Sequence, residues 1–437
     1  MPSPTGHGAG GSLRTGPHPS GPRRRPDVLV VGAGLAGLAC AADLVAAGLA
    51  VRVIEGADAV GGRMRTDRHD GFLLDRGFQV FNTGYPQVRA RLRLKDLGLR
   101  PFTRGVIAVT DRGHVRIGAP FPRPGYAAGL IPGRLATARD LLALARLSVR
   151  DAAGPSRTLK RAPDRTMRKA LTDAGFSPGM TERFFLPFFS GVFLENQLAT
   201  SARVFHLVWR SMLRGTLCLP ARGVQAVPEQ LAAALPPGTV ALGTPVRELT
   251  EKGLLLADGA ELPAPRTVVA TGPAEAARLL PGLEVPHTRT VTTYYHVTGT
   301  APLDDPVLLI DSARRQLLNT CVISRVAPGY APPGRALIST SVLGPDTPGR
   351  RQEVLDRLAM MYRTDTTTWE PVAARTVPGA LPAMPPPQPL SRTTRLGGGR
   401  YVCGDHRATG SVQGALASGA RAAREVLADL RAPSGSR

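Results

Sequence analysis

Lysine is scarce in this chain of 437 residues, although basic residues are abundant. Among the 55 basic residues only Lys95, Lys160, Lys169 and Lys252 are lysines, which leaves 51 arginines scattered along the whole length. An even scatter differs from the basic stripe of a nucleic-acid-binding surface, and no nucleic-acid motif accompanies it. We therefore expect no nucleic-acid partner despite the formal net charge of +22, whereas an anionic substrate or an acidic membrane surface stays compatible with it.

Cysteine is equally rare. The four cysteines, Cys40, Cys218, Cys321 and Cys403, form no CxxC pair and have no histidine cluster beside them. This spacing excludes a disulfide framework and a structural zinc site, and it fits a reducing compartment. We therefore expect no metal site and predict a cytoplasmic protein.

An uninterrupted apolar run that could span a bilayer is also missing. The apolar stretch 28–53 follows three arginines at 23–25 and so imitates a twin-arginine signal, but Asp43 and Arg52 interrupt it. Residues 1–26 contain no acidic residue and almost no apolar ones. We predict a disordered tail there, because such a segment cannot bury enough surface to offset its chain entropy.

What the sequence does contain is a complete strand–turn–helix–strand pattern near its start. Residues 27–31 are typical of a buried parallel strand, segment 32–37 has the spacing GxGxxG, and an Ala/Leu-rich helix is predicted to about residue 47. A second strand, 51–54, ends in Glu55, about 20 positions after the glycines, where a carboxylate can accept hydrogen bonds from adenosine ribose hydroxyls. The pattern predicts an α/β fold with a Rossmann-type dinucleotide-binding domain; the alternative is a glycine-rich turn in another α/β protein.

Each glycine of this turn has its own physical task. Gly32 permits a tight turn, Gly34 lets a pyrophosphate approach the backbone, and Gly37 lets helix and strand pack closely. The first helical turn, with Leu35 and Ala36, supplies N–H groups and partial positive charge for the phosphates.

Three further motifs follow in a specific order. Residues 60–66 read VGGRMRT, residues 267–273 read TVVATGP, and residues 401–419 contain YVCGDHR and GSVQGALASG. With the stretch GFLLDRGFQ at 71–79, these residues resemble the FAD-dependent amine oxidase superfamily, which includes carotenoid (phytoene-type) desaturases and protoporphyrinogen oxidases. The resemblance covers both ends of the chain and implies a flavoprotein.

The resemblance also implies roles for individual residues. Backbone at Gly62 passes close to the cofactor, and Arg63 lies against the diphosphate or ribityl region, where its planar fork of donors neutralises charge. Asp405 ends a strand beside the ribityl chain, and a helix beginning near Ser411 directs N–H groups at the flavin N1/C2=O edge. We expect FAD to be non-covalent, because Cys403 does not stand where the family's covalent linkage falls.

The expected site reaches one strand in the middle of the chain. The resemblance implies that the backbone of Val246 lies against the adenine, although an ordinary core valine predicts the same burial. His406 is expected behind the site or at the surface, and no catalytic residue is assigned. The expected FAD-binding residues are Gly32, Gly34, Leu35, Ala36, Gly37, Glu55, Gly62, Arg63, Val246, Gly404, Asp405, Ser411 and Val412.

Members of the superfamily interleave two domains. By resemblance, residues 27–84, 218–285 and 395–432 form the FAD-binding domain, and residues 85–217 and 286–394 form a mixed-sheet plus helical substrate domain. In the latter, segment 184–193 holds five phenylalanines, which form either core packing or an aromatic wall for an apolar substrate.

A second stretch of the substrate domain, residues 290–297, alternates like a strand. Its Tyr294, Tyr295 and His296 either line the site or form a solvated edge. A basic amphipathic helix predicted over 132–150 suits peripheral contact with an anionic membrane, although a packed surface helix is the commoner explanation.

The function implied is a FAD-dependent oxidoreductase that removes hydride from a C–H bond of an apolar (polyene- or porphyrinogen-like) or amine substrate. The alternatives are a FAD-dependent non-redox isomerase and a flavin-binding protein without turnover. Many amine oxidases of this type hold a lysine near flavin N5, yet no lysine follows Lys252, which lies in a predicted turn. Direct hydride transfer, without a lysine, is therefore expected.

Overall fold

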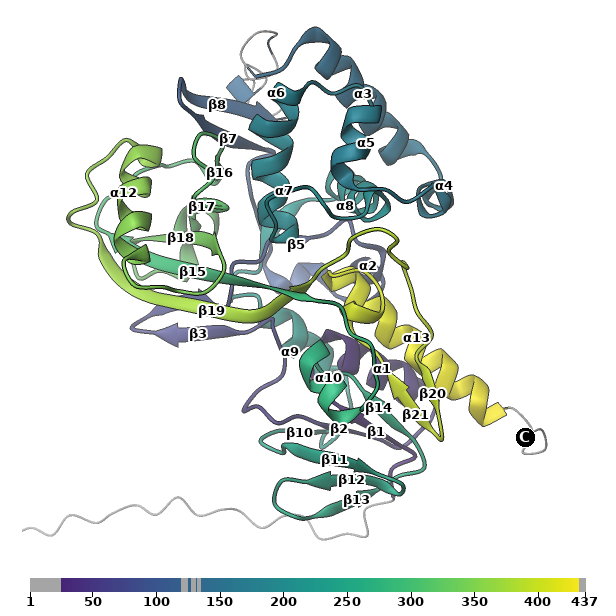
Figure 1. Cartoon of the computed structure of the whole chain (residues 1–437). Helices are drawn as coiled ribbons and strands as arrows, with labels where there is room; N and C mark the ends of the chain where they lie inside the picture. The colour runs from purple at the N-terminus through teal and green to yellow at the C-terminus, as the bar shows by residue number, and fades with distance from the viewer. Residues whose placement is uncertain (1–24, 119–124, 127–130, 132–134, 432–437) are drawn as a thin grey trace, which may run out of the picture.

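The computed structural model describes residues 25–118, 125–126, 131 and 135–431 (Figure 1). Nearly all of the tail predicted for residues 1–26 lies outside this range. A six-stranded and a seven-stranded sheet, both accompanied by helices, dominate the described chain. This mixed architecture confirms the predicted α/β fold class.

The six-stranded sheet is built around the strand that opens the glycine-rich turn. β1 (Val28–Val31) pairs in parallel with β2 (Val51–Ile54) on one side and with β14 (Thr267–Val269) on the other. All of β1 is buried, as expected of a parallel strand covered on both faces. The remaining strands are β10 (Val240–Ala241) beyond β2, and β21 (Arg400–Val402) and β20 (Arg395–Gly397) beyond β14.

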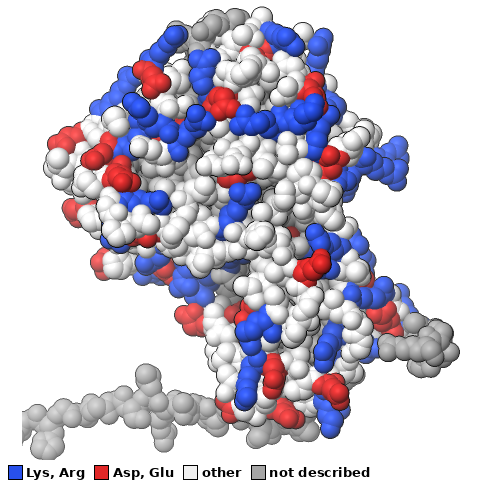
Figure 2. Space-filling model, viewed as in Figure 1, with Lys and Arg blue, Asp and Glu red and all other residues white. Residues whose placement is uncertain are grey.

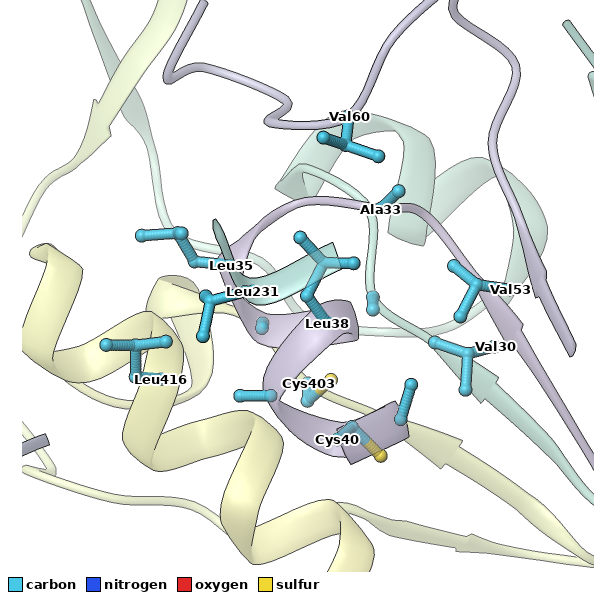
Figure 3. Close-up of a cluster of buried hydrophobic side chains, with 14 of the residues drawn as sticks. Val30, Ala33, Leu35, Leu38, Cys40, Val53, Val60, Leu231, Cys403 and Leu416 are labelled. Carbon is cyan, nitrogen blue, oxygen red and sulfur yellow. The ribbon is translucent and has the colours of Figure 1, made fainter. Parts of the chain in front are cut away.

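Helices cover one face of this sheet. α1 (Leu35–Ala46) packs between the sheet and α13 (Val412–Arg431). Figure 3 shows Val30 and Val53 next to each other on the paired strands, with Leu38 of α1 in the same cluster. α9 (Ala226–Ala233) packs on the same face. The opposite face of the sheet is covered by α10 (Pro273–Leu279) and by a small sheet of three strands, β11 (Val246–Thr250), β12 (Gly253–Leu256) and β13 (Glu261–Pro263).

The two helices α1 and α13 approach each other closely because one contact residue has no side chain. A Cβ on Gly419 of α13 would lie 2.1 Å from the carbonyl oxygen of Ala36 in α1. Such an overlap cannot be relieved by a rotamer change, since the clashing atom is backbone. The C-terminal helix is thereby held against the helix that follows the glycine-rich turn.

The seven-stranded sheet carries the second half of the architecture (Figure 1). Its strands, in spatial order, are β19 (Glu370–Pro382), β15 (Thr288–Thr298), β18 (Ala336–Leu343), β17 (Asn319–Val322), β16 (Leu308–Asp311), β7 (Gly105–Thr110) and β8 (Gly113–Gly118). β15 pairs with a strand on each side and residues 291–297 are buried, so the solvated-edge interpretation of Tyr294, Tyr295 and His296 is wrong. α12 (Arg350–Tyr362) covers one face of this sheet.

A helical region packs against the far end of the seven-stranded sheet. Its helices are α3 (Ala138–Ala153), α4 (Ser156–Arg161), α5 (Met167–Asp173), α6 (Pro178–Met180), the π-helix η3 (Thr181–Phe185), α7 (Leu186–Phe193) and α8 (Ala202–Arg214). Phe185, Phe189 and Phe193 are fully buried and contact Phe205, or each other, in one aromatic cluster. Core packing therefore accounts for most of the phenylalanine run, and only Phe188 is partly exposed.

The amphipathic helix begins later than expected. α3 starts at Ala138, where Thr137 and Asp140 form a capping box, whereas the sequence placed its start at residue 132. Residues 132–134 lie outside the described chain. Among the described residues, no helix combines the length and the apolar composition needed to cross a bilayer.

Short elements connect the two halves. They are β3 (Thr66–His69) with β4 (Phe72–Asp75), the sheet β5 (Phe81–Asn82), β9 (Leu217–Leu219) and β6 (Arg100–Pro101), and the helical segments α2 (Pro86–Arg91), η1 (Leu94–Leu97), α11 (Ile323–Val326), η4 (Pro328–Tyr330) and η5 (Asp405–Arg407). The predicted boundary between residues 217 and 218 falls within β9, and the division into two domains stays a prediction.

Candidate flavin site

The glycine-rich turn after β1 uses each of its glycines for a different steric reason. Gly32 has a φ of +104°, and a Cβ on it would lie 3.0 Å from the carbonyl oxygen of Ala270. A Cβ on Gly37 would lie 2.0 Å from the carbonyl oxygen of Gly32. A Cβ on Gly34, in contrast, would meet nothing within 4 Å. The chain therefore needs glycine at 32 and 37 to fold, and keeps open space beside Gly34.

That open space lies at the N-terminus of α1. Gly34 is the N-cap residue, and no described side chain caps the helix. The N–H groups of the first turn, which includes Leu35 and Ala36, are thus available to an acceptor, and the helix dipole favours an anionic one. The loop carrying Gly62 passes beside this point, since a Cβ on Gly62 would lie 3.6 Å from the Cα of Gly34.

Glu55 at the end of β2 holds the turn in place. Its two carboxylate oxygens accept hydrogen bonds from the backbone N–H groups of Ala33 at 2.6 Å and Ala57 at 2.9 Å. Val246 lies close by at the start of β11 and is 9 % exposed, and its carbonyl accepts a hydrogen bond from Arg278 at 2.9 Å. The roles expected for Glu55 toward ribose and for Val246 toward adenine stay predictions.

Arg63 joins the loop after β2 to the far end of the chain. Its Nη2 donates to Asp405 Oδ1 at 2.6 Å and its Nη1 donates to the carbonyl of Ala380 at 2.8 Å. Burial lowers the pKa of Arg63, but the carboxylate of Asp405 raises it by more, so that the pKa of Arg63 stays above its usual range. Gln79 completes the contact by donating to the Arg63 carbonyl at 3.0 Å.

The segment after β21 brings the C-terminal residues of the expected site to the same edge of the sheet. Gly404 has a φ of +151°, a value that glycine tolerates, and Asp405 follows at 5 % exposure. Ser411 Oγ accepts a hydrogen bond from the N–H of Gly414 at 3.0 Å, and α13 begins at Val412. The structure thus gathers the glycine-rich turn, Arg63 and Asp405 at one edge.

Comparison with known proteins matches this geometry. The profile of the family described as flavin containing amine oxidoreductase covers residues 35–427. The chain belongs to this family. The predicted resemblance to FAD-dependent amine oxidases is therefore confirmed, at the level of the family.

Individual relatives are similar over shorter stretches. Protoporphyrinogen oxidase 2 of Arabidopsis thaliana is 39 % identical over 97 residues, or 22 % of this chain and 19 % of that protein. Putrescine oxidase of Kocuria rosea is 44 % identical over 78 residues, or 18 % and 16 % of the two chains. These matches span about a fifth of the curated relatives. Cyclohexylamine oxidase from Brevibacterium oxydans IH-35A shares the fold, with a TM-score of 0.67 at 17 % identity over 93 % of this chain and 99 % of that one.

Within this family fold, His406 is buried, which rules out the expected surface position, and its place behind the site stays a prediction. It is 4 % exposed, and neither of its ring nitrogens has a hydrogen-bond partner in the described chain. Burial lowers the pKa of His406 to about 4; Asp405 opposes that shift, and Arg407, Arg63 and Arg392 add to it. The imidazole is therefore neutral at pH 7.

Sequence reasoning missed a second buried titratable group, Asp75. It is fully buried, and it accepts hydrogen bonds from Thr66 Oγ1 at 2.6 Å, the Val224 N–H at 3.1 Å and the Tyr330 hydroxyl at 2.9 Å. Tyr295 donates to its carbonyl at 2.8 Å. Burial raises the pKa of Asp75 to about 6, and the hydrogen bonds from Thr66, Val224 and Tyr330 to its carboxylate only partly oppose the rise. No local sequence signal marks these partners, which lie up to 255 residues away.

The four lysines all lie at the surface. Lys95, Lys160, Lys169 and Lys252 are exposed, Lys252 in the turn between β11 and β12, and Lys169 pairs with Asp173 on α5. Among the contacts of the described residues, no lysine pairs with Arg63 or Asp405, which bind each other.

Proposed function

We propose that this protein is a FAD-dependent oxidoreductase that takes hydride from a C–H bond of an apolar (polyene- or porphyrinogen-like) or amine substrate. The observation that carries the proposal is the uncapped N-terminus of α1, with open space beside Gly34 where a Cβ would meet nothing. A diphosphate is the ligand that this combination of free N–H groups and close backbone suits best. Membership of the flavin family and the names of the relatives support the assignment.

We assign residues of this edge of the sheet to successive parts of FAD. The first turn of α1 would bind the diphosphate, Glu55 the adenosine ribose, and Arg63 with Asp405 the diphosphate–ribityl region. The N-terminus of α13, at Ser411 and Val412, would present N–H groups and positive dipole to the flavin ring. When bound, FAD supplies the hydride acceptor for the reaction.

A non-covalent cofactor agrees with the state of the cysteines. All four are free and buried, and burial raises the pKa of the Cys403 and Cys218 thiols to about 12. A covalent thioether needs a reactive thiolate, which burial disfavours. Figure 3 shows Cys403 beside Cys40 within the apolar cluster. Free buried thiols also fit the proposed reducing, cytoplasmic setting.

The surface position of every lysine shapes the proposed mechanism. A proton-transferring amine near the flavin is not available from this chain, and an arginine cannot replace it, because its pKa stays far above 7. The chain's own contribution is then to orient the C–H bond and to exclude water. This favours an apolar, porphyrinogen- or polyene-like substrate over an amine.

One anaerobic experiment separates the three candidate functions. The purified yellow protein is mixed with porphyrinogens, polyenes and amines without oxygen, and the oxidised flavin absorbance is followed. Bleaching supports the oxidoreductase, and turnover only after prior reduction of the flavin supports the isomerase. A flavin-binding protein without turnover shows neither response. If the purified protein binds no FAD, the proposed function is wrong.

A specific observation favours a second, independent property, contact with an anionic membrane. On α3, Leu142 is 50 % and Val149 66 % exposed, beside the exposed Arg139 and Arg146. Figure 2 shows basic side chains dense over the part of the molecule that carries the helical region. Exposed apolar groups flanked by arginine suit the boundary between headgroups and acyl chains.

Co-sedimentation with liposomes tests this contact. We expect the protein to pellet with vesicles rich in phosphatidylserine at low salt, and the double variant Leu142→Ser, Val149→Ser to stay in solution. Met360→Ser on α12 is the matched control, since Met360 is 58 % exposed on another helix. Equal sedimentation of the double variant and wild type, or no binding by wild type, would overturn the proposal.

A further inference from the structure

Buried polar atoms without a partner gather at one edge of the six-stranded sheet. The described residues contain ten such side-chain atoms, and four of them are Thr271 Oγ1, His406 Nδ1, His406 Nε2 and Arg407 Nε. Thr271 follows β14 and the other two residues follow β21. Adjacent parallel strands therefore place all four atoms at their carboxyl ends.

This edge adjoins the glycine-rich turn. A Cβ on Gly32 would lie 3.3 Å from the backbone nitrogen of Thr271, and a Cβ on Gly404 would lie 3.6 Å from the Thr271 carbonyl oxygen and 2.5 Å from His406 Nδ1. From β1 the chain continues to β2 on one side of β1, and it later returns to form β14 on the other side. The strand order therefore reverses between β1 and β14. In open α/β sheets, ligands bind just outside this point.

An unpaired imidazole is costly in such a place. A buried donor or acceptor without a partner loses its hydration and gains nothing in return. The neutral ring has one N–H donor and one acceptor nitrogen, and the Thr271 hydroxyl has a donor of its own. A ligand with oxygen acceptors at this edge would satisfy both residues, as would a trapped water.

We propose that His406, with Thr271 beside it, is a hydrogen-bonding residue for the diphosphate segment of FAD. The inference rests on the proposed function, since it needs FAD as the ligand. The imidazole N–H and the threonine hydroxyl donate to diphosphate oxygens, while the second ring nitrogen accepts from a hydroxyl or a water. His406 supplies a neutral donor, which complements the charge that Arg63 brings to the same region.

The test compares two buried histidines in the full-length protein. His406→Phe removes both ring nitrogens at similar volume, and His296→Phe is the matched control. His296 is 2 % exposed, carries an unpartnered Nδ1, and has a pKa that burial lowers to about 4, but it lies in β15 near Trp369. We expect His406→Phe to raise the FAD dissociation constant about tenfold, as loss of a buried hydrogen bond does, and His296→Phe to leave it within about twofold. Thr271→Val is expected to raise it by a smaller factor.

Thermal melting of the apoprotein and the FAD-loaded protein separates a ligand contact from a structural role. Removing unsatisfied atoms is expected to leave the His406→Phe apoprotein as stable as wild type or more so, while the loaded variant melts at a lower temperature than loaded wild type. Unchanged FAD affinity in His406→Phe, or equal destabilisation of the apo and loaded forms, would overturn the inference and point to a trapped water. If wild type itself binds no FAD, the proposed function fails instead, and the two failures are thereby distinguishable.

Discussion

Arg63 Nη2 lies 2.6 Å from Asp405 Oδ1 and joins two residues that are 342 positions apart in the sequence. The arginine side chain is 32 % exposed and the aspartate only 5 %. The contact ties the loop after β2 to the turn after β21. One ion pair thus holds together the two chain segments expected at the diphosphate–ribityl part of the FAD site.

Replacing either partner is expected to weaken FAD binding. Asp405→Asn leaves the guanidinium without its carboxylate, and Arg63→Met leaves a nearly buried carboxylate unpaired, so we expect each to raise the FAD dissociation constant about 10- to 100-fold. The double variant should lose less FAD-binding free energy than the two single variants lose together, because both single substitutions remove the same contact. Titration of apoprotein with FAD, followed by flavin fluorescence, measures all three. Arg76→Met is the control, since Arg76 pairs with Asp67 at the surface, and a loss of FAD affinity there equal to that of Arg63→Met would contradict the assignment.

Two glycines of the same turn are expected to fail in different ways. Gly34→Val places its side chain in open space, so the apoprotein should fold with a loss of about 1 kcal/mol or less, while FAD binding falls at least about 100-fold. Gly37→Ala drives a Cβ into the carbonyl oxygen of Gly32 and should prevent folding. Circular dichroism melting measures whether each variant folds and how stable it is. The absorbance of bound flavin measures FAD binding. Full retention of yellow cofactor by Gly34→Val would exclude the diphosphate from this position.

The parts of the site that the sequence predicts well are the local ones. β1, the glycine-rich turn, α1 and Glu55 follow from residues within one short segment, whose hydrophobic pattern and glycine spacing leave little choice. The amphipathic pattern predicts a start for α3 that is too early, although Thr137 and Asp140 form a capping-box pattern that marks the true start. The partners of Asp75 and the burial of His406 depend on segments brought together only by the folded chain. Composition and spacing carry no information about such long-range contacts.

Each lysine can be removed singly without loss of flavin reduction, if hydride passes directly to the flavin. Lys95, Lys160, Lys169 and Lys252 are exposed, so Lys→Met at each position should change the rate of flavin reduction by less than about threefold and leave FAD bound. Anaerobic stopped-flow with a substrate found by the bleaching assay measures the rate. A thousandfold lower rate of flavin reduction in any one variant, with FAD still bound, would show that the reaction depends on that lysine and contradict the prediction.

The ionisation of Asp75 is expected to make folding less favourable as pH rises. Its folded-state pKa of about 6 lies above the usual value of about 4, because burial disfavours the charged form. The folded chain therefore holds this proton more tightly than the unfolded chain, and the stabilisation present below pH 4 is lost as pH rises to about 6. Two pKa units correspond to about 3 kcal/mol at most. In Asp75→Asn the side-chain amide oxygen can still accept hydrogen bonds from Thr66 Oγ1 and the Val224 N–H, and no charge is buried.

Asp311 provides the comparison with the opposite sign. It is equally buried, and burial raises its pKa, but Arg357 and the backbone N–H of Arg314 together bring the pKa below its usual value. Its stabilisation is therefore present above about pH 4 and lost as pH falls through the lowered pKa. Urea unfolding between pH 3.5 and 7.5 measures the free energy of unfolding of wild type, Asp75→Asn and Asp311→Asn. Relative to wild type, Asp75→Asn should gain stability as pH rises, by about 2 kcal/mol across this range, whereas Asp311→Asn should lose most at neutral pH. If the difference in the free energy of unfolding between Asp75→Asn and wild type does not change with pH, Asp75 is not the group that titrates. Its carboxylate is then stabilised by more than the three hydrogen bonds that it accepts.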